Sequence, residues 1–212
     1  KLPGGSSNET WIIKYIFNNL EKKIVFRRHF DGIRSKDNNY PPLSLSLESK
    51  VMIEAYNADI PVPKILYNTD SKSSLGEGFF MEFIEGIALG NKIVEKDFLE
   101  NKEINLSKQC GYILAKIHSI NFKNIENIEK SEASNEMKKY FEIYKNYNLN
   151  IPVFDFSFKW LEMNIPNNDK LFLIHGDFRN GNILMSKKSG VKSILDWELL
   201  HLGDPHEDLA WI

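Results

Sequence analysis

The hydrophobic pattern of the chain changes once, near residues 82–86, and this change limits the possible folds more than any other feature. Before this point, short segments are rich in β-branched and aromatic residues, which is typical of strands. After it, apolar residues recur every three or four positions, which is typical of helices that bury one face. The sequence therefore predicts an α+β fold with two lobes, at residues 1–84 and 85–212.

Short apolar segments in the first part predict pairs of antiparallel strands. The turn-like pair Asn18-Asn19 separates the first two segments, which favours a hairpin. Residues 45–56 carry apolar side chains on one helical face and predict a helix. The expected strands lie at residues 10–17, 23–28, 65–67 and 79–84.

Apolar stripes in the second part predict three helices, and the first apolar residues of these stripes are Leu106, Met137 and Phe154.

Composition excludes several functions for the whole chain. The formal net charge is −2 and basic residues are scattered, so we expect neither nucleic acid nor an anionic membrane as a partner. Cys110 is the only cysteine, which excludes an internal disulfide and a cysteine-built metal site.

Two further observations bear on the compartment. No apolar stretch approaches the roughly 20 residues of a membrane helix, and the chain start lacks the layout of a signal peptide. A single cysteine fits a reducing environment. We therefore expect a cytoplasmic protein that binds a small molecule.

The most informative stretch begins with an apolar strand at residues 171–174, followed by a polar loop. Strands are expected at residues 183–185 and 191–195, and the polar turn between them ends in glycine, which predicts an antiparallel hairpin. Asn182 precedes the first of these strands and Asp196 follows the second. Because paired strands lie about 5 Å apart, we expect the Asn182 amide and the Asp196 carboxylate to be neighbours.

Asp177 lies on the loop just before this hairpin, so we expect it to face the same spot. Oxygen ligands that leave room for water and phosphate oxygens are those that Mg²⁺ prefers, which makes Asn182 and Asp196 candidate metal ligands. A carboxylate that orients and deprotonates a hydroxyl, beside a held metal ion, is what phosphoryl transfer requires. The alternatives are turn-capping roles for Asp177 and Asp196, a metal-dependent hydrolase, or a catalytically silent nucleotide-binding module.

This region resembles the catalytic loop and metal-binding segment of aminoglycoside phosphotransferase-like kinases. The resemblance rests on His175-x-Asp177-x-x-x-x-Asn182, the hairpin, Asp196-Trp197-Glu198 and Gly203-Asp204-Pro205. It implies a protein-kinase-like fold with an antiparallel-sheet N-lobe and a mainly helical C-lobe. It also implies ATP and Mg²⁺ as cofactors and transfer of the γ-phosphoryl group to a hydroxyl of a small molecule, with Asp177 as base and Asn182 and Asp196 as metal ligands.

The pattern is closest to the branch found with acyl-CoA dehydrogenases. This likeness implies association with an acyl-CoA dehydrogenase domain, in the full-length protein or a neighbouring gene, and favours a hydroxyacyl acceptor. Members of the family continue beyond the position of Trp211-Ile212 and have a strand before the position of Gly4. We therefore expect the chain to be truncated at both ends.

The resemblance extends to the nucleotide site in the first part. Gly4-Gly5-Ser6-Ser7-Asn8 occupies the place of the phosphate-covering loop, where glycines let backbone N–H groups approach an anion. Arg27 corresponds to the basic residue that grips the α- and β-phosphates, commonly a lysine, with Glu48 as its partner. Glu82 and Ile84 lie in the segment that resembles the hinge whose backbone binds adenine.

Some of these assignments have simpler alternatives. Gly4 to Asn8 also fits any flexible turn, and Arg27 with Glu48 also fits a solvated surface pair. Alternation along a strand puts Arg27 and Arg28 on opposite faces, so only one of them reaches the site.

Polar residues near Asp177 complete the set. Arg179 follows Asp177 at the spacing where protein kinases often carry a lysine that reaches the γ-phosphate, so we expect a phosphate clamp. His175 is expected to organise the loop by hydrogen bonding rather than to act as a base. Glu198, Asp204 and Asp208 are candidates for metal or acceptor binding, but we expect Asp204 and Asp208 to accept backbone N–H groups under the loop.

Overall fold

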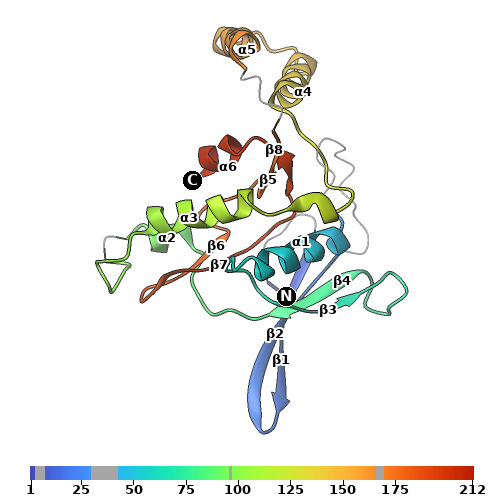
Figure 1. The fold of residues 1–212 in the computed structure, drawn as a ribbon, viewed down its shortest axis with the longest axis vertical. Helices are drawn as coiled ribbons and strands as arrows, with labels where there is room; N and C mark the ends of the chain where they lie inside the picture. Colours follow the sequence, from blue (N-terminus) through green and yellow to red (C-terminus); the bar gives the residue numbers. More distant parts are fainter. Residues whose placement is uncertain (3–7, 30–42, 96, 166–169) are drawn as a thin grey trace.

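The computed structural model describes residues 1–2, 8–29, 43–95, 97–165 and 170–212. Within these ranges the chain forms a strand-rich part and a helix-rich part (Figure 1). The two parts follow one another at the change in hydrophobic pattern, so the expected α+β fold is confirmed.

A four-stranded antiparallel sheet forms the first part. Its strands are β1 (Asn8–Phe17), β2 (Leu20–His29), β3 (Ile65–Thr69) and β4 (Gly78–Glu82), in the order β1-β2-β4-β3. Asn18 and Asn19 have φ values of 51° and 58°, the conformation that a two-residue hairpin turn needs. The predicted strands are therefore present, although β4 ends at Glu82 rather than at Ile84.

Helix α1 (Leu45–Asn57) lies against β3 and β4. The helix begins after Ser44, whose side chain accepts a hydrogen bond from the Leu47 N–H group at 3.2 Å and so satisfies an otherwise unpaired donor. Its apolar stripe is buried together with Phe79 of β4. Glu48 lies on the same buried side of the helix, which directs its carboxylate toward the interior.

The second part combines helices with two small antiparallel sheets. The helices are α2 (Gly90–Ile93), α3 (Leu106–His118), the short 3₁₀ helix η1 (Phe122–Asn124), α4 (Ala133–Asn146), α5 (Pro152–Asn164) and α6 (His206–Trp211). One sheet pairs β5 (Phe172–Ile174) with β8 (His201–Gly203), and the other is the hairpin of β6 (Ile183–Ser186) and β7 (Gly190–Ile194). The predicted stripe of α3 is buried, and the predicted hairpin is present.

Backbone hydrogen bonds join the two parts. Residues 83–86 form the connecting segment between the two parts, and Ile87 follows it directly. The backbone of Ile87 exchanges two 2.8 Å hydrogen bonds with that of Met185 in β6. Gly86 is packed so closely that an added Cβ atom would lie 2.6 Å from Leu184 Cγ and 3.0 Å from the Met185 carbonyl oxygen. A single apolar cluster, which includes Phe79 and Trp197, continues through both parts. The hairpin that carries the candidate metal ligands is therefore held against the sheet.

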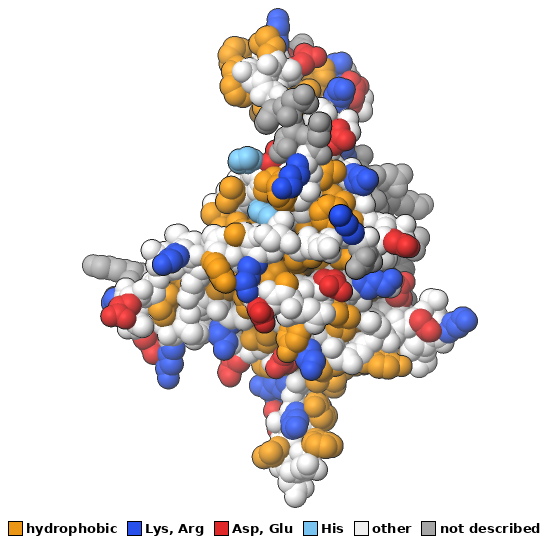
Figure 2. All heavy atoms as spheres, viewed as in Figure 1, with side chains coloured by type: hydrophobic (Ala, Val, Ile, Leu, Met, Phe, Trp, Pro, Cys, Tyr) orange, Lys and Arg blue, Asp and Glu red, His pale blue; other side chains and the backbone are white. Residues whose placement is uncertain are grey.

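Two hairpins project from this body, the β1–β2 hairpin and the α4–α5 pair (Figure 1). Exposed apolar side chains gather on both projections, for example Ile16 and Leu20 on the first and Phe156 and Met163 on the second (Figure 2). Among the helices that the structure describes, none combines the length and the apolar character that a membrane crossing requires.

Candidate active site

One buried carboxylate holds the backbone of the loop between β5 and β6. Asp208 of α6 is fully buried and accepts hydrogen bonds from the backbone N–H groups of His175 and Gly176, each at 2.9 Å. His118, at the end of α3, places its Nε2 2.9 Å from the same carboxylate. Burial acts to raise the pKa of Asp208, but these hydrogen bonds outweigh it and lower the pKa below its ordinary value. The support expected from Asp208 is therefore present.

His175 connects this loop to the end of β7. Its Nδ1 accepts a hydrogen bond from the Asp177 N–H group at 3.2 Å, and its Nε2 donates to the Leu195 carbonyl oxygen at 3.1 Å. Its ring also lies against Trp197, with centroids 4.8 Å apart. Burial lowers the pKa of His175, so the ring is neutral and uses both nitrogens to order the loop. This agrees with an organising role rather than a proton-transfer role.

Asp177 lies at the centre of the loop. Asn182 Nδ2 donates to Asp177 Oδ2 at 2.6 Å and to its carbonyl oxygen at 2.9 Å, and Arg179 Nε donates to Oδ1 at 2.7 Å. The structure therefore brings together the predicted base, the predicted clamp and one predicted metal ligand. Because the Asn182 nitrogen faces Asp177, its amide oxygen faces the other way.

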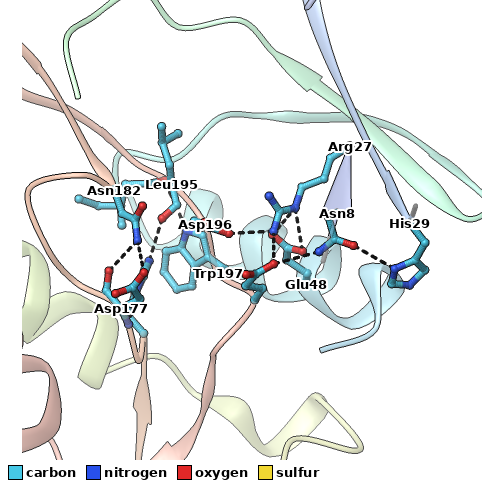
Figure 3. A network of polar contacts seen from close by, with 12 residues as sticks. Asn8, Arg27, His29, Glu48, Asp177, Asn182, Leu195, Asp196 and Trp197 are labelled. Atoms are coloured by element: carbon cyan, nitrogen blue, oxygen red, sulfur yellow. Dashed lines mark hydrogen bonds and ion pairs between the residues drawn. The ribbon is translucent and has the colours of Figure 1, made fainter. Parts of the chain in front are cut away.

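The hairpin places Asn182 beside the end of β7, as the strand spacing predicts. Ile183 and Ile194 are paired residues, and the Leu195 N–H group donates to the Asn182 carbonyl oxygen at 2.8 Å. Asp196 follows with a φ value of 63°, a left-handed conformation that aspartate tolerates better than most residues. The chain turns there, and the Asp196 carboxylate points toward Arg27 (Figure 3).

Arg27 reaches across from β2 and contacts three carboxylates (Figure 3). Its Nε lies 3.2 Å from Glu48 of α1. Its Nη2 donates to Asp196 Oδ1 at 2.8 Å and to Glu198 Oε2 at 2.9 Å. Arg27 and Glu48 are only 9% and 1% exposed, so they form a buried pair and not the solvated pair that was the alternative.

Arg28 faces the opposite side of the sheet. Its Nε lies 3.1 Å from Glu9 Oε2, away from the carboxylates around Arg27. The predicted alternation is therefore confirmed, and Arg27 is the arginine that reaches the site.

The charges around Arg27 do not balance. One guanidinium faces the carboxylates of Glu48, Asp196 and Glu198. Burial raises the pKa of Glu48 to about 7, although the Arg27 charge acts in the opposite direction. Burial alone would lower the pKa of Arg27, but the three carboxylates raise it, so the guanidinium stays charged. The excess negative charge fits a divalent cation.

The oxygen donors fit Mg²⁺ in particular. Asn182 and Asp196 offer an amide oxygen and a carboxylate, the donor chemistry that Mg²⁺ prefers when water and phosphate complete its coordination. Within the described part of the chain, no three His, Cys, Asp or Glu side chains gather into a complete protein metal site. A metal ion here would therefore depend on further oxygen ligands from a bound nucleotide or water.

The remaining predicted residues lie elsewhere or have other contacts. Gly4, Gly5, Ser6 and Ser7 lie outside the described residues. Asn8 begins β1, and its side chain contacts Glu198 and His29. Glu82 ends β4 and Ile84 lies in the connecting segment, and the described contacts link neither of them to Asp177.

Asp204 departs from the expectation. Its Oδ1 accepts from the N–H group and Nδ1 of His206, the first residue of α6, at 2.9 and 2.6 Å, and the described contacts do not link it to the loop between β5 and β6. Sequence reasoning also missed the joint contacts of Asn8 and Glu198. The sequence offered a signal for Glu198 alone, because the Asp196-x-Glu198 spacing keeps two carboxylates near each other, and both contact the Arg27 guanidinium.

Solved structures with a similar fold include two phosphotransferases. A mutant of aminoglycoside 2′-phosphotransferase IIIa in complex with GDP has a TM-score of 0.69 at 16% identity, covering 99% of this chain and 68% of that one. Spectinomycin phosphotransferase in complex with ADP and spectinomycin has a TM-score of 0.62 at 17% identity, covering 100% of this chain and 66% of that one. These likenesses establish the expected protein-kinase-like fold.

The chain belongs to the phosphotransferase enzyme family, APH, whose family model matches residues 1–212. Among its relatives is acyl-CoA dehydrogenase family member 10 of Mus musculus, which is 26% identical over 214 residues. That match covers 98% of this chain, but the chain spans only 19% of the relative. The expected likeness to the acyl-CoA dehydrogenase-associated branch is confirmed.

Proposed function

We propose that the protein is an ATP- and Mg²⁺-dependent kinase that transfers the γ-phosphoryl group to a hydroxyl of a small molecule. The observation that carries the proposal is the convergence of two groups of residues from opposite sides of the molecule. Arg27 and Glu48 come from the sheet and α1, while Asp177, Asn182 and Asp196 come from the catalytic loop and hairpin. Phosphoryl transfer depends mainly on positioning and charge neutralisation, which these residues supply.

In this proposal Asn182 and Asp196 hold Mg²⁺, which would neutralise phosphate charge and orient the triphosphate. The excess of carboxylates over arginine supports this assignment. The Asn182 side chain suits this role, because its amide nitrogen donates to Asp177 and its amide oxygen remains available for a cation.

Arg27 is proposed to bind the nucleotide phosphates. Its Nε and Nη2 are engaged by carboxylates, and within the described residues its Nη1 has no protein acceptor. Two anchors hold the guanidinium plane, so Nη1 can meet a phosphate with little further loss of side-chain freedom. The backbone from Gly4 to Asn8 would cover the phosphates, and the backbone at Glu82 and Ile84 would bind adenine.

Asp177 is proposed to orient the acceptor hydroxyl and take its proton. The hydroxyl oxygen attacks the γ-phosphorus, the bond from that phosphorus to the bridging β–γ oxygen breaks, and ADP leaves. No covalent intermediate with the enzyme is required. Arg179 is about half exposed and beside Asp177, so it can turn toward the γ-phosphate when substrates bind.

The acceptor is proposed to be a hydroxyacyl compound. The dehydrogenase name of the mouse relative supports a substrate related to acyl-CoA chemistry and an association with an acyl-CoA dehydrogenase domain. The GDP and ADP bound to the two solved phosphotransferases support a purine nucleotide as donor.

The test separates the roles of the two aspartates in a full-length protein that is screened for ATP consumption with hydroxyl compounds. Asp177→Asn should lower kcat by about 10²-fold or more, the scale of a lost general base, and leave ATP affinity nearly unchanged. Asp196→Asn should weaken Mg²⁺-ATP binding and turnover together, because it removes a charged metal ligand. Asp97→Asn is the matched control, since this side chain is 85% exposed.

Three results would contradict the proposal. These are an absence of nucleotide binding to the folded protein, equal ATP affinity with and without Mg²⁺, and nucleotide binding that is lost with Asp177→Asn but kept with Asp196→Asn. The last result would mean that the two carboxylates have exchanged roles.

A further inference from the structure

Glu198 connects residues 195–198, here called the proposed metal-binding loop, to three segments of the strand-rich part. Its Oε2 accepts hydrogen bonds from Arg27 Nη2 at 2.9 Å and from Asn8 Nδ2 at 3.0 Å. Its carbonyl oxygen accepts from the Leu43 N–H group at 3.2 Å. Glu198 therefore contacts β2, β1 and the segment before α1 at once.

Asn8 is oriented by a second contact. Its Oδ1 lies 2.9 Å from His29 Nδ1, so its amide nitrogen is the atom that faces Glu198. The side chain is only 5% exposed. A buried amide without a hydrogen-bond partner destabilises the folded protein. The two contacts of Asn8 therefore hold the start of β1 in place against Glu198.

We propose that Glu198 is a positioning residue that acts through Asn8 and Arg27 to hold the phosphate-binding side of the site over the proposed metal-binding loop. The inference rests on the proposed function, and it gives Glu198 a task different from that of Asp196. In this proposal Asp196 binds the cation. Glu198 keeps its hydrogen bonds with Arg27 and Asn8, which lie on the proposed phosphate-binding side.

Asp196 and Glu198 share the guanidinium of Arg27, and this explains why two acids lie so close together. Nη2 donates to both Asp196 and Glu198, and Nε lies against Glu48. If Asp196 coordinated a metal ion, Glu198 and Glu48 would still hold the guanidinium at two atoms. Its plane would then keep the orientation that presents Nη1 to a phosphate, which is the preorganisation that a long side chain otherwise lacks.

Asn8 extends the same control to the backbone. It is the first residue of β1 and directly follows residues 4–7 in the chain. A contact between Asn8 and Glu198 thus sets where the chain enters β1 relative to Asp196, which lies only two positions before Glu198.

The experiment exchanges the two partners. Glu198→Gln removes the carboxylate, Asn8→Asp creates two facing carboxylates, and the double variant restores one amide and one carboxylate with their places exchanged. Titration calorimetry measures the affinities for Mg²⁺-ATP and for adenosine at several Mg²⁺ concentrations. Glu103→Gln, at an exposed position, is the control for loss of a negative charge.

Each single variant should weaken Mg²⁺-ATP binding by about tenfold and leave adenosine affinity near that of the wild type. Glu198→Gln removes the charge that strengthens the hydrogen bonds from Arg27 and Asn8, and Asn8→Asp places two carboxylates face to face. The double variant should recover most of the loss. A role limited to general stability would not separate ATP from adenosine in this way. If Asn8→Asp does not fold, Asn8→Ala replaces it, and Glu198→Gln should then cost less in that background than in the wild type.

Independent, multiplying effects of the two substitutions would overturn the inference. So would an increased Mg²⁺ requirement in Glu198→Gln that Asn8→Asp does not share, because that result would make Glu198 a metal ligand. Both outcomes leave the proposed function standing, since the wild type still binds Mg²⁺-ATP. A wild type that binds no Mg²⁺-ATP would overturn the proposed function and this inference together.

Discussion

Glu48 offers a sharp test of the electrostatics around Arg27, because its carboxyl group is 1% exposed and its pKa is raised to about 7 by burial. A raised pKa means that the folded protein binds the proton more tightly than the unfolded chain, where the ordinary value is 4.5. The stabilising contribution is therefore complete below pH 4.5, is lost as the pH rises to about 7, and stays lost above it.

The size of the effect follows from the shift. A change from 4.5 to about 7 corresponds, at about 1.4 kcal/mol per pKa unit, to about 3 kcal/mol of unfolding free energy. Glu48→Gln cannot ionise, yet its amide oxygen can still accept from Arg27 Nε. The variant should therefore lack the pH-dependent loss, and its stability should rise relative to the wild type as the pH increases.

Urea unfolding of both proteins between about pH 5 and about pH 8 measures this difference. The wild type should lose about 2–3 kcal/mol relative to Glu48→Gln across the range, because part of the effect is already present at pH 5, while Glu54→Gln, on the exposed face of α1, should follow the wild type. A difference between wild type and Glu48→Gln that is the same at every pH would refute the reasoning. It would show that Arg27 keeps Glu48 ionised throughout and that Coulomb attraction outweighs burial.

Two further predictions concern binding and turn geometry. Arg27→Ala should weaken ATP binding by more than tenfold and adenosine binding much less, whereas Arg28→Ala should change either little; a larger effect of Arg28→Ala in calorimetry would contradict the assignment. Gly190→Ala should destabilise the protein by about 1–2 kcal/mol more than Gly76→Ala in urea unfolding. Both glycines have a φ of 75°, so the backbone strain is the same in the two variants. Only the added Cβ atom at Gly190 would displace the side chain of Gln109, which forms hydrogen bonds with the β6–β7 turn. Equal destabilisation of the two glycine variants would mean that Gln109 moves without cost.

Local rules predicted much of this site. The Asn18-Asn19 turn and the glycine-ended turn at Gly190 each predicted a hairpin, because short connections decide which strands can pair. The second of these hairpins was sufficient to place Asn182 beside the end of the strand that leads to Asp196. Strand alternation likewise separated Arg27 from Arg28.

Contacts between distant segments could not be predicted in the same way. Asn8 and Glu198 are 190 positions apart, and neither residue lies in a pattern that names the other. Strand β8 is three residues long and contains His201 and Gly203, so it carries no alternation, and it becomes a strand because β5 offers it backbone partners. Asp204 lies just before α6 and Asp208 lies within it, and only this difference in position decides that Asp204 contacts His206 and Asp208 supports the loop.

The two sides of the site are held by different physical means, and this difference suits the proposed chemistry. Asp208 is fully buried, and its hydrogen bonds with the backbone of His175 and Gly176 and with His118 hold the loop between β5 and β6 in place. Arg27 instead divides its charge among carboxylates that outnumber it. In the proposed function, a metal–nucleotide complex would bring both a cation for Asp196 and anions for Arg27, so the charges would exchange partners without any of them being left unpaired in a buried place. The proposed base would then be positioned before substrates arrive, while the proposed phosphate-binding side would complete its pairing only when the nucleotide is bound.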